Sequence, residues 1–327
     1  MRRMEQRKGG IRWKTRGAMA GTIVILFLIL TAVVLGLAGK EEKKQRKFGA
    51  TYMTMNNPYF EVLDENIKEI VEGNGDILIT RDPLQDQEKQ NAQIRDMIDE
   101  GIDVLFLNPV DWKGIQSSLE LCRKKKIPVF VMDTPVYEKE LVVSTILSDN
   151  YEAGAACAKD MMRKRQSAKI VIVYSQNINS TSERVKGFLD TIREHPEYQV
   201  VAKKNGAAEL EVGMREMKKI INEGITFDVV LGGNDPTALG CIAAMQKMNK
   251  EEGVMVYGID GSPDAKAMIK AGYMEATSAQ SPVRIGMKAA ETAYEYLDGK
   301  PVEQEIKIPV TLITRDNMKN YSISGWQ

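Results

Sequence analysis

From Phe48 to the end of the chain, short runs rich in Val, Ile, Leu and Phe alternate with longer amphipathic stretches. Such apolar runs are typical of buried strands, and strands that alternate with helices build parallel sheets. In the first half the pattern predicts strands at Phe48–Met53, Asp76–Thr80, Val104–Leu107, Pro128–Met132 and Val142–Leu147. It predicts helices that begin near Pro58, Gln85 and Trp112. A doubly wound α/β fold follows.

The same alternation begins again in the second half of the chain. The predicted strands there are Lys169–Val173, Tyr198–Ala202, Val229–Leu231, Val254–Tyr257 and Glu275–Ala279. With 327 residues the chain is long enough for two domains, each with its own core. We therefore predict two Rossmann-like lobes of similar build, each with a parallel sheet.

An uncharged segment, 18–38, precedes these lobes and is long enough as a helix to cross a bilayer core of about 30 Å. Seven basic residues and one acid come before it, so the positive-inside rule places segment 1–17 in the cytoplasm. We predict a transmembrane anchor at 18–38 and a linker at 39–46. The alternative is a cleaved signal peptide, whose apolar region usually spans about 7–15 residues.

Composition excludes several classes of function. Lys plus Arg equals Asp plus Glu, at 45 each, so no net charge favours nucleic acid. Cys122, Cys157 and Cys241 fall in predicted helices and are interpreted as buried thiols, not a disulfide. A single histidine, His195, leaves no basis for a histidine zinc site or a reliable catalytic triad. We expect no enzyme activity, no cofactor and no metal.

Polar residues directly after strands are the candidate site, because ligands of open α/β sheets bind beyond the carboxyl ends of the strands. The candidates are Asn57, Tyr59, Phe60, Asp133, Arg184, Asn234, Asp260 and Gln280. Carboxylates accept hydrogen bonds from sugar hydroxyls, Arg donates, amides do both, and aromatic rings cover C–H faces. Taken singly, each has a structural alternative: a turn, a helix cap or a core position.

Several short motifs occur together in order. They are Met53–Phe60, Leu107-Asn108-Pro109, Ser148-Asp149-Asn150, Gly233-Asn234-Asp235, Gly258–Gly261 and Ala279-Gln280. In this order and spacing, residues 47–315 resemble the ribose-type periplasmic sugar-binding proteins. The resemblance implies a periplasmic binding protein-like I fold with three hinge crossings. The implied lobes are 47–148 plus 281–309 and 149–280 plus 310–327.

The resemblance also implies that the eight candidates contact the ligand and that aromatic rings sandwich a sugar. We add Thr134, which stands where ribose binders place an arginine beside Asp133. Met53 replaces a small polar residue of those proteins, and Ala208 lies near a lost stacking aromatic. These departures indicate a ligand other than ribose, bulkier or differently hydroxylated.

The implied function is an extracytoplasmic protein that closes over a monosaccharide and presents it to the permease of an ABC-type importer. The alternative is a membrane-tethered sugar-sensing co-receptor for a sensor histidine kinase. A sugar-responsive repressor would need a helix-turn-helix where segment 18–38 stands. A glycosidase would need Asp133 and Asp260 as acid and base, and it is disfavoured. We expect a monomer at the cell membrane, secreted or periplasmic if the N-terminal segment is cleaved, without nucleic acid.

Overall fold

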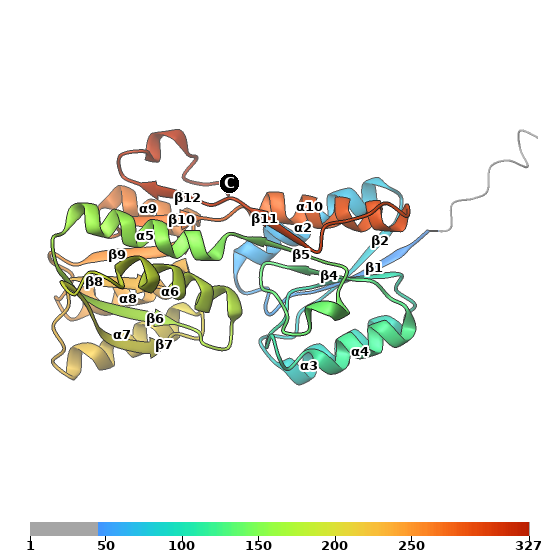
Figure 1. Ribbon diagram of the computed structural model, residues 1–327, viewed down its shortest axis with the longest axis horizontal. Helices are drawn as coiled ribbons and strands as arrows, with labels where there is room; N and C mark the ends of the chain where they lie inside the picture. The colour runs from blue at the N-terminus through green and yellow to red at the C-terminus, as the bar shows by residue number, and fades with distance from the viewer. Residues whose placement is uncertain (1–44, 327) are drawn as a thin grey trace, which may run out of the picture. The chain divides into compact units, whose positions relative to one another are not determined.

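Two six-stranded sheets organise the computed structural model, which describes residues 45–326 (Figure 1). The predicted membrane segment, 18–38, lies outside the described residues. From residue 45 to residue 326, the helices are all too short or too polar to cross a bilayer. Both sheets belong to the compact unit that begins at Arg46.

The first sheet has the strand order β11-β5-β4-β3-β1-β2, and every pair of neighbours is parallel. Its strands are β1 (Lys47–Thr51), β2 (Ile77–Arg81), β3 (Val104–Leu107), β4 (Val129–Met132), β5 (Ser144–Ser148) and β11 (Glu305–Ile308). Helices α2 (Pro58–Gly73) and α10 (Pro282–Leu297) pack together, and α3 (Gln87–Asp99) packs with α4 (Gln116–Lys125). A short 3-10 turn, Lys139–Leu141, precedes β5. We call this unit the first lobe.

The second sheet has the order β12-β10-β9-β8-β6-β7. Its strands are β6 (Ala168–Tyr174), β7 (Tyr198–Asn205), β8 (Val229–Gly232), β9 (Met255–Asp260), β10 (Ala276–Ala279) and β12 (Thr311–Thr314). Helix α5 (Asn150–Lys164) packs on α6 (Asn179–Ile192), and α7 (Leu210–Asn222) packs on α8 (Asp235–Lys247). Helix α9 (Pro263–Ala271) and a 3-10 turn, Met318–Asn320, complete the second lobe.

The second sheet is mixed, so the prediction of two parallel sheets was wrong for one strand. Strand β12 pairs antiparallel with β10. The reason lies in the connection: β11 runs parallel to β5 and ends at Ile308, and β12 starts at Thr311 in the other sheet. The chain therefore enters the second sheet from the carboxyl end of β10. The sequence analysis also missed β11 and β12, which lie at sheet edges and lack a long apolar run.

The chain passes between the sheets three times, each time through one or two residues. Strand β5 ends at Ser148 and α5 begins at Asn150, and β10 ends at Ala279 before α10 begins at Pro282. The third passage is the link between β11 and β12. Three short links leave the two lobes free to rotate about them as bodies.

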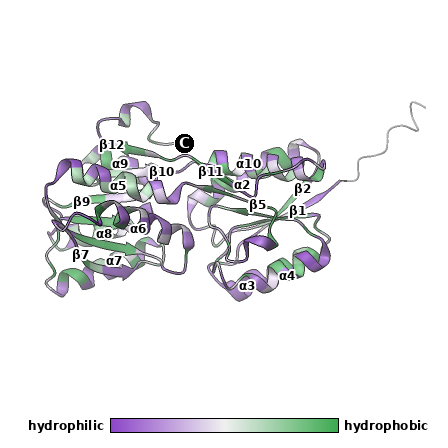
Figure 2. Ribbon diagram, viewed as in Figure 1, coloured by the Kyte–Doolittle hydropathy of each residue, from purple (hydrophilic) through white to green (hydrophobic). Residues whose placement is uncertain are grey.

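Helices cover both faces of each sheet. Because successive side chains along a strand point to opposite faces, neighbouring residues pack against different helices. In β4, Phe130 and Met132 pack under α2 and α10, whereas Val129 and Val131 pack under α3 and α4. The strands of the second lobe alternate in the same way. Figure 2 shows the apolar residues gathered on the strands of both lobes. All three cysteines are buried and free, which confirms their interpretation as core thiols.

Two helices begin later than the sequence pattern predicted. Helix α3 begins at Gln87, capped by the side chain of Asp86, because Gln85 has a left-handed backbone that a helix cannot include. Helix α4 begins at Gln116, since the turn after Trp112 is held by the Asp111 side chain, which accepts from two backbone N–H groups. The predicted start at Pro58 was correct, with Asn57 as the N-cap.

Candidate ligand-binding cleft

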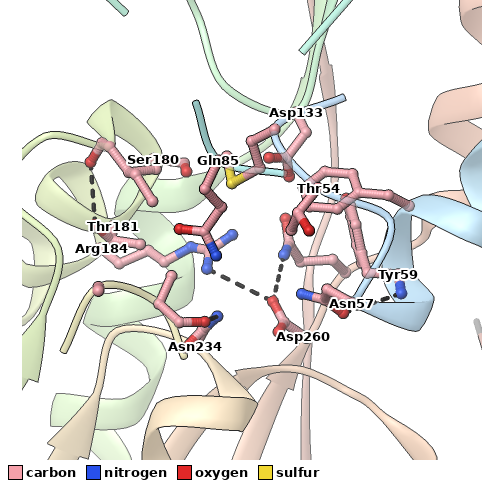
Figure 3. Close-up of a pocket in the computed structure, with 16 residues that line it drawn as sticks. Thr54, Asn57, Tyr59, Gln85, Asp133, Ser180, Thr181, Arg184, Asn234 and Asp260 are labelled. Atoms are coloured by element: carbon pink, nitrogen blue, oxygen red, sulfur yellow. Dashed lines mark hydrogen bonds and ion pairs between the residues drawn. The ribbon is translucent and has the colours of Figure 1, made fainter. Parts of the chain in front are cut away.

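A cavity between the two lobes gathers eight of the nine predicted site residues (Figure 3). The 16 residues that line it are Met53, Thr54, Asn57, Tyr59, Phe60, Gln85, Asp133, Ile178, Ser180, Thr181, Arg184, Ala207, Ala208, Asn234, Asp260 and Gln280. Its volume, measured for the centres of water-sized spheres, is about 40 Å³. That space holds a few water molecules, so the lobes are close together in this structure.

The turn between β1 and α2 supplies the aromatic wall of the cavity. The side-chain oxygen of Asn57 accepts from the backbone N–H of Tyr59 at 3.0 Å and so caps α2. Directly after the cap, Tyr59 and Phe60 are buried with their rings edge to face, 5.3 Å between centroids. Asn57 is therefore both the cap of α2 and a residue that lines the cavity. Tyr59 and Phe60 are likewise both buried core residues and part of the cavity wall.

Asp133 follows β4 with φ of 63°, a left-handed backbone that turns its side chain toward the cleft. Its carboxylate accepts from Asn108 Nδ2 at 3.3 Å and from Thr134 Oγ1 at 2.9 Å. Burial raises the pKa of Asp133, and nearby Arg184 opposes this rise. The acid is therefore held by neutral donors, and the positive charge that opposes the rise comes from Arg184 of the second lobe.

Thr134 is the one predicted residue that does not line the cavity. It is 1% exposed, and its hydroxyl lies 2.9 Å from Ser180 Oγ in addition to donating to Asp133. Because the Thr134 proton goes to Asp133, Ser180 donates to Thr134, and this bond joins the two lobes. In this arrangement the Thr134 side chain adds no space to the cavity, because it is buried and its hydroxyl contacts Ser180.

Arg184 of α6 is 3% exposed and is fixed within the second lobe. Its Nε donates to Asn150 Oδ1 at 2.8 Å, and its Nη1 donates to the carbonyl oxygen of Gly233 at 2.9 Å. The same Nη1 lies 3.6 Å from Asp260 Oδ1. The guanidinium is therefore presented to the cavity in one orientation, with its charge shared with Asp260.

Asp260 ends β9 and is hydrogen-bonded from two directions. Gln280 Nε2 donates to Oδ1 at 2.7 Å, and the backbone N–H of Asp235 donates to Oδ2 at 3.4 Å. Burial raises the pKa of Asp260 to about 8; Arg184 opposes this rise, and the neighbouring Asp235 carboxylate adds to it. Asp235 itself lies outside the cavity lining, where it accepts from Ser262 and Thr277.

Asn234 caps α8 by accepting from the Thr237 backbone N–H at 3.1 Å, and its Nδ2 donates to the carbonyl oxygen of Ala208 at 3.0 Å. Two buried polar atoms at the cavity lack an ordinary hydrogen bond within the described part of the chain. They are Gln280 Oε1 and Tyr59 Oη, the latter lying near Asp133. An unsatisfied buried polar group costs about 1–3 kcal/mol, so a ligand that pairs with these atoms is favoured.

The family model described as periplasmic binding protein domain matches residues 48–301, which contain every residue that lines this cavity. The chain belongs to the periplasmic binding protein family. It is 31% identical to the ribose import binding protein of Bacillus subtilis over 84% of this chain and 88% of that one. It is also 30% identical to the D-apiose import binding protein of Paraburkholderia graminis, over 80% and 85% of the two chains.

Solved structures of periplasmic binding proteins share the fold. An ABC transporter solute binding protein from Bacillus halodurans, with bound myo-inositol, has a TM-score of 0.80 at 24% identity, over 86% of this chain and 99% of that one. Another from Mycobacterium smegmatis, with bound glycerol, has a TM-score of 0.81 at 25% identity, over 86% and 100%. The two-lobed architecture predicted from the sequence is thereby confirmed.

The sequence analysis of this periplasmic binding protein missed several lining residues. Ser180 and Thr181 lie one turn before Arg184 on α6, so the helical spacing could have identified them. Gln85 lies in the loop after β2, four residues beyond its last residue, so a search that covered whole loops after strands could have included it. From residue 45 to residue 326, no cluster of His, Cys, Asp and Glu is placed to hold a metal ion.

Proposed function

We propose that this protein binds one monosaccharide between its lobes and presents it to the permease of an ABC-type importer. One observation carries the proposal: a buried cavity lined from both lobes combines two carboxylates, one guanidinium, four side-chain amides and two aromatic rings. This is the set of groups that a small polyhydroxyl ligand requires. The family, and relatives named as import binding proteins, support the importer over the sensor-kinase alternative.

In this proposal the ligand contacts are Asn57, Tyr59, Phe60, Asp133, Arg184, Asn234, Asp260 and Gln280. Asp133 and Asp260 accept from hydroxyls, and Arg184 donates between them. Tyr59 and Phe60 cover an apolar face of the ring. Thr134 acts through Asp133, which its hydroxyl orients, and does not touch the ligand. No step of covalent chemistry is needed.

We further propose that binding works by lobe closure. The lobes are the predicted ones, 47–148 plus 281–309 and 149–280 plus 310–327; the strand order supports this division. A sugar that contacts both lobes is bound best when they are closed, so it shifts the population toward that state. The cavity is too small for a sugar ring as it stands. We infer that the contacts with Gln280 and Arg184 rearrange when ligand enters.

The family supports an extracytoplasmic location. We propose that segment 18–38 tethers the chain to the membrane and that the lobes lie outside. The support is its lack of charge and the basic residues before it. Treating membranes with carbonate at high pH, followed by N-terminal sequencing of the mature protein, distinguishes a retained anchor from a cleaved signal. An N-terminus that begins after residue 38 contradicts the anchor.

Thermal melting with a panel of pentoses, hexoses and cyclitols tests the function. A ligand at 100 times its Kd adds about 2.7 kcal/mol to the free energy of unfolding, which raises the melting temperature by roughly 5–10 °C. Asp260→Ala should abolish that shift. Asp298→Ala, at an exposed carboxylate beyond α10, is the matched control and should keep it. If no sugar raises the melting temperature, the monosaccharide proposal is wrong.

A further inference from the structure

Backbone strain in the described residues is concentrated around the cleft. Eight non-glycine residues between residues 45 and 326 have positive φ; five of them line the cavity between the lobes, and a sixth, Leu84, precedes one of the five. The six are Leu84, Gln85, Asp133, Ala207, Ala208 and Asp260. Left-handed non-glycine residues cost about 1–3 kcal/mol each and gather at ligand clamps. Two of the sites, Leu84-Gln85 and Ala207-Ala208, are consecutive pairs on opposite lobes, with φ between 51° and 62°.

The Leu84-Gln85 turn is fixed to the first lobe. Its backbone N–H groups donate to Asp82 Oδ1, at 2.9 Å, and to the carbonyl oxygen of Met53, at 2.8 Å. Asp86 then caps α3. Met53 itself lines the cavity. The turn therefore moves with the wall of the site, and the Gln85 side chain projects from it into the cleft (Figure 3).

The Ala207-Ala208 turn is fixed to the second lobe in a matching way. The N–H of Ala207 donates to Asn205 Oδ1 at 3.0 Å, and the carbonyl oxygen of Ala208 accepts from Asn234. The next residue, Glu209, is the N-cap of α7, but its side chain makes no capping hydrogen bond. Its carboxylate is available for another donor, and the N-terminus of α7 stabilises its charge.

Gln85 and Glu209 meet across the cleft. Gln85 Nε2 donates to Glu209 Oε1 at 2.7 Å, between residues 124 positions apart in the chain. Gln85 lines two adjoining cavities: the inner one described above and an outer one of about 670 Å³, which Glu209 and Trp326 also line. The two cavities share Thr54, Asn57, Ala208 and Asp260 as well. The hydrogen bond therefore lies where the inner cavity opens into the outer one.

We propose that the Gln85–Glu209 hydrogen bond is a latch that confines the ligand to a single sugar ring and excludes disaccharides. The inference rests on the proposed function and deepens it. A second ring attached to a sugar in the inner cavity would extend past Gln85 into the outer cavity, where the two latch residues now meet. With the latch formed, that path is closed. Gln85 is thus a specificity-determining residue.

Equilibrium titration and stopped-flow dissociation on the full chain, purified with detergent, test the latch. The probes are matched pairs: D-glucose with cellobiose, D-xylose with xylobiose, and D-galactose with galactobiose. We expect the wild type to bind one monosaccharide at least 100-fold more tightly than its disaccharide. In Gln85→Ala the monosaccharide should dissociate about fivefold faster, and the preference over the disaccharide should fall about tenfold.

A reciprocal pair of substitutions separates the latch from a general effect on folding. Gln85→Glu sets two carboxylates against each other and should speed dissociation more than Gln85→Ala. Adding Glu209→Gln restores an amide paired with a carboxylate and should return the rate to within twofold of the wild type. Lys89→Ala, at an exposed position on the first turn of α3, is the control and should leave both rates unchanged.

Three results would overturn the latch: equal affinity of the wild type for both members of a pair, an unchanged preference in Gln85→Ala, or no recovery in the reciprocal variant. Each of these leaves monosaccharide binding intact and so differs from failure of the proposed function. If no sugar of the melting panel binds to the wild type, the proposed function fails and the latch fails with it.

Discussion

Replacing Asp260 with asparagine should change stability and affinity in opposite directions. Asp260 is 3% exposed, and its carboxyl group has an ordinary pKa of 3.8 that rises to about 8 in the folded protein. The folded state therefore holds a proton that the unfolded state releases between about pH 4 and pH 8. In the ligand-free protein, the contribution of this group to the free energy of unfolding is fully present below pH 4 and is lost as the pH rises through 8.

The size of the effect follows from this shift. One pKa unit corresponds to about 1.36 kcal/mol, so the shift sets an upper bound of about 6 kcal/mol. The neighbouring Asp235 shares the titration, and an amide loses part of the hydrogen bonding to the Asp235 backbone N–H. We expect Asp260→Asn to stabilise the ligand-free protein at pH 8 by about 1–3 kcal/mol, roughly 2–4 °C in Tm per kcal/mol. At pH 4 the gain should vanish.

Sugar binding should weaken in the same variant. Sugar hydroxyls that donate to Asp260 favour its carboxylate, and a hydrogen bond to a charged group contributes about 1.5–3 kcal/mol. Asp260→Asn should therefore raise Kd by about 10- to 150-fold. Wild-type binding should also release protons at pH 7, measurable by calorimetry in buffers of different ionisation enthalpy. A ligand-free variant that is less stable than wild type at pH 8 and binds equally well would refute this reasoning.

Three further predictions concern packing and the C-terminal segment. Gly154→Ala would place a Cβ 1.7 Å from the carbonyl oxygen of Arg184. Urea denaturation should show a loss of more than about 3 kcal/mol in the free energy of unfolding, and titration should show weaker sugar binding. A loss below about 1 kcal/mol would contradict the close approach of α5 and α6. Lys266 is buried and donates to the carbonyl oxygens of Ser322 and Gly325. Lys266→Met should expose residues 318–326 to limited proteolysis, with Lys270→Met as the control; equal cleavage in both variants counts against the anchoring role. Burial raises the pKa of the Cys122 and Cys241 thiols to about 12 and raises the pKa of the Cys157 thiol further. None of the three should therefore react with Ellman's reagent at pH 8 before the protein unfolds. Rapid reaction in the native state would show that the thiols are accessible.

The sequence predicted the parts of the fold that depend on local pattern. Strands such as Val104–Leu107 are continuous apolar runs, and their bounds were correct because both faces of the sheet are covered. The helix at Pro58 was correct because Asn57 and Pro58 form a local capping signal. Edge strand β12 was missed because its position depends on a link between lobes, and nothing in Thr311–Thr314 itself specifies its antiparallel direction.

The candidate site was predictable to the extent that it follows strand ends. Asp133 follows β4 directly, Asn234 stands two residues after β8, and Asp260 is the last residue of β9; all three line the cavity. The role of Thr134 and the meeting of Gln85 with Glu209 were beyond the sequence, because both depend on how two distant loops face each other. Left-handed turns at alanine also carry no sequence signal, unlike those at glycine.

The most direct test of ligand-driven closure is a distance between the lobes measured with and without sugar. Lys125→Cys on the first lobe and Asn222→Cys on the second introduce exposed thiols, while the native cysteines are buried. Spin labels at these positions in residues 41–327 report the distance by pulsed electron resonance. The account predicts a broad distribution without ligand that narrows to one short distance with the bound sugar. A distribution that sugar leaves unchanged would contradict it.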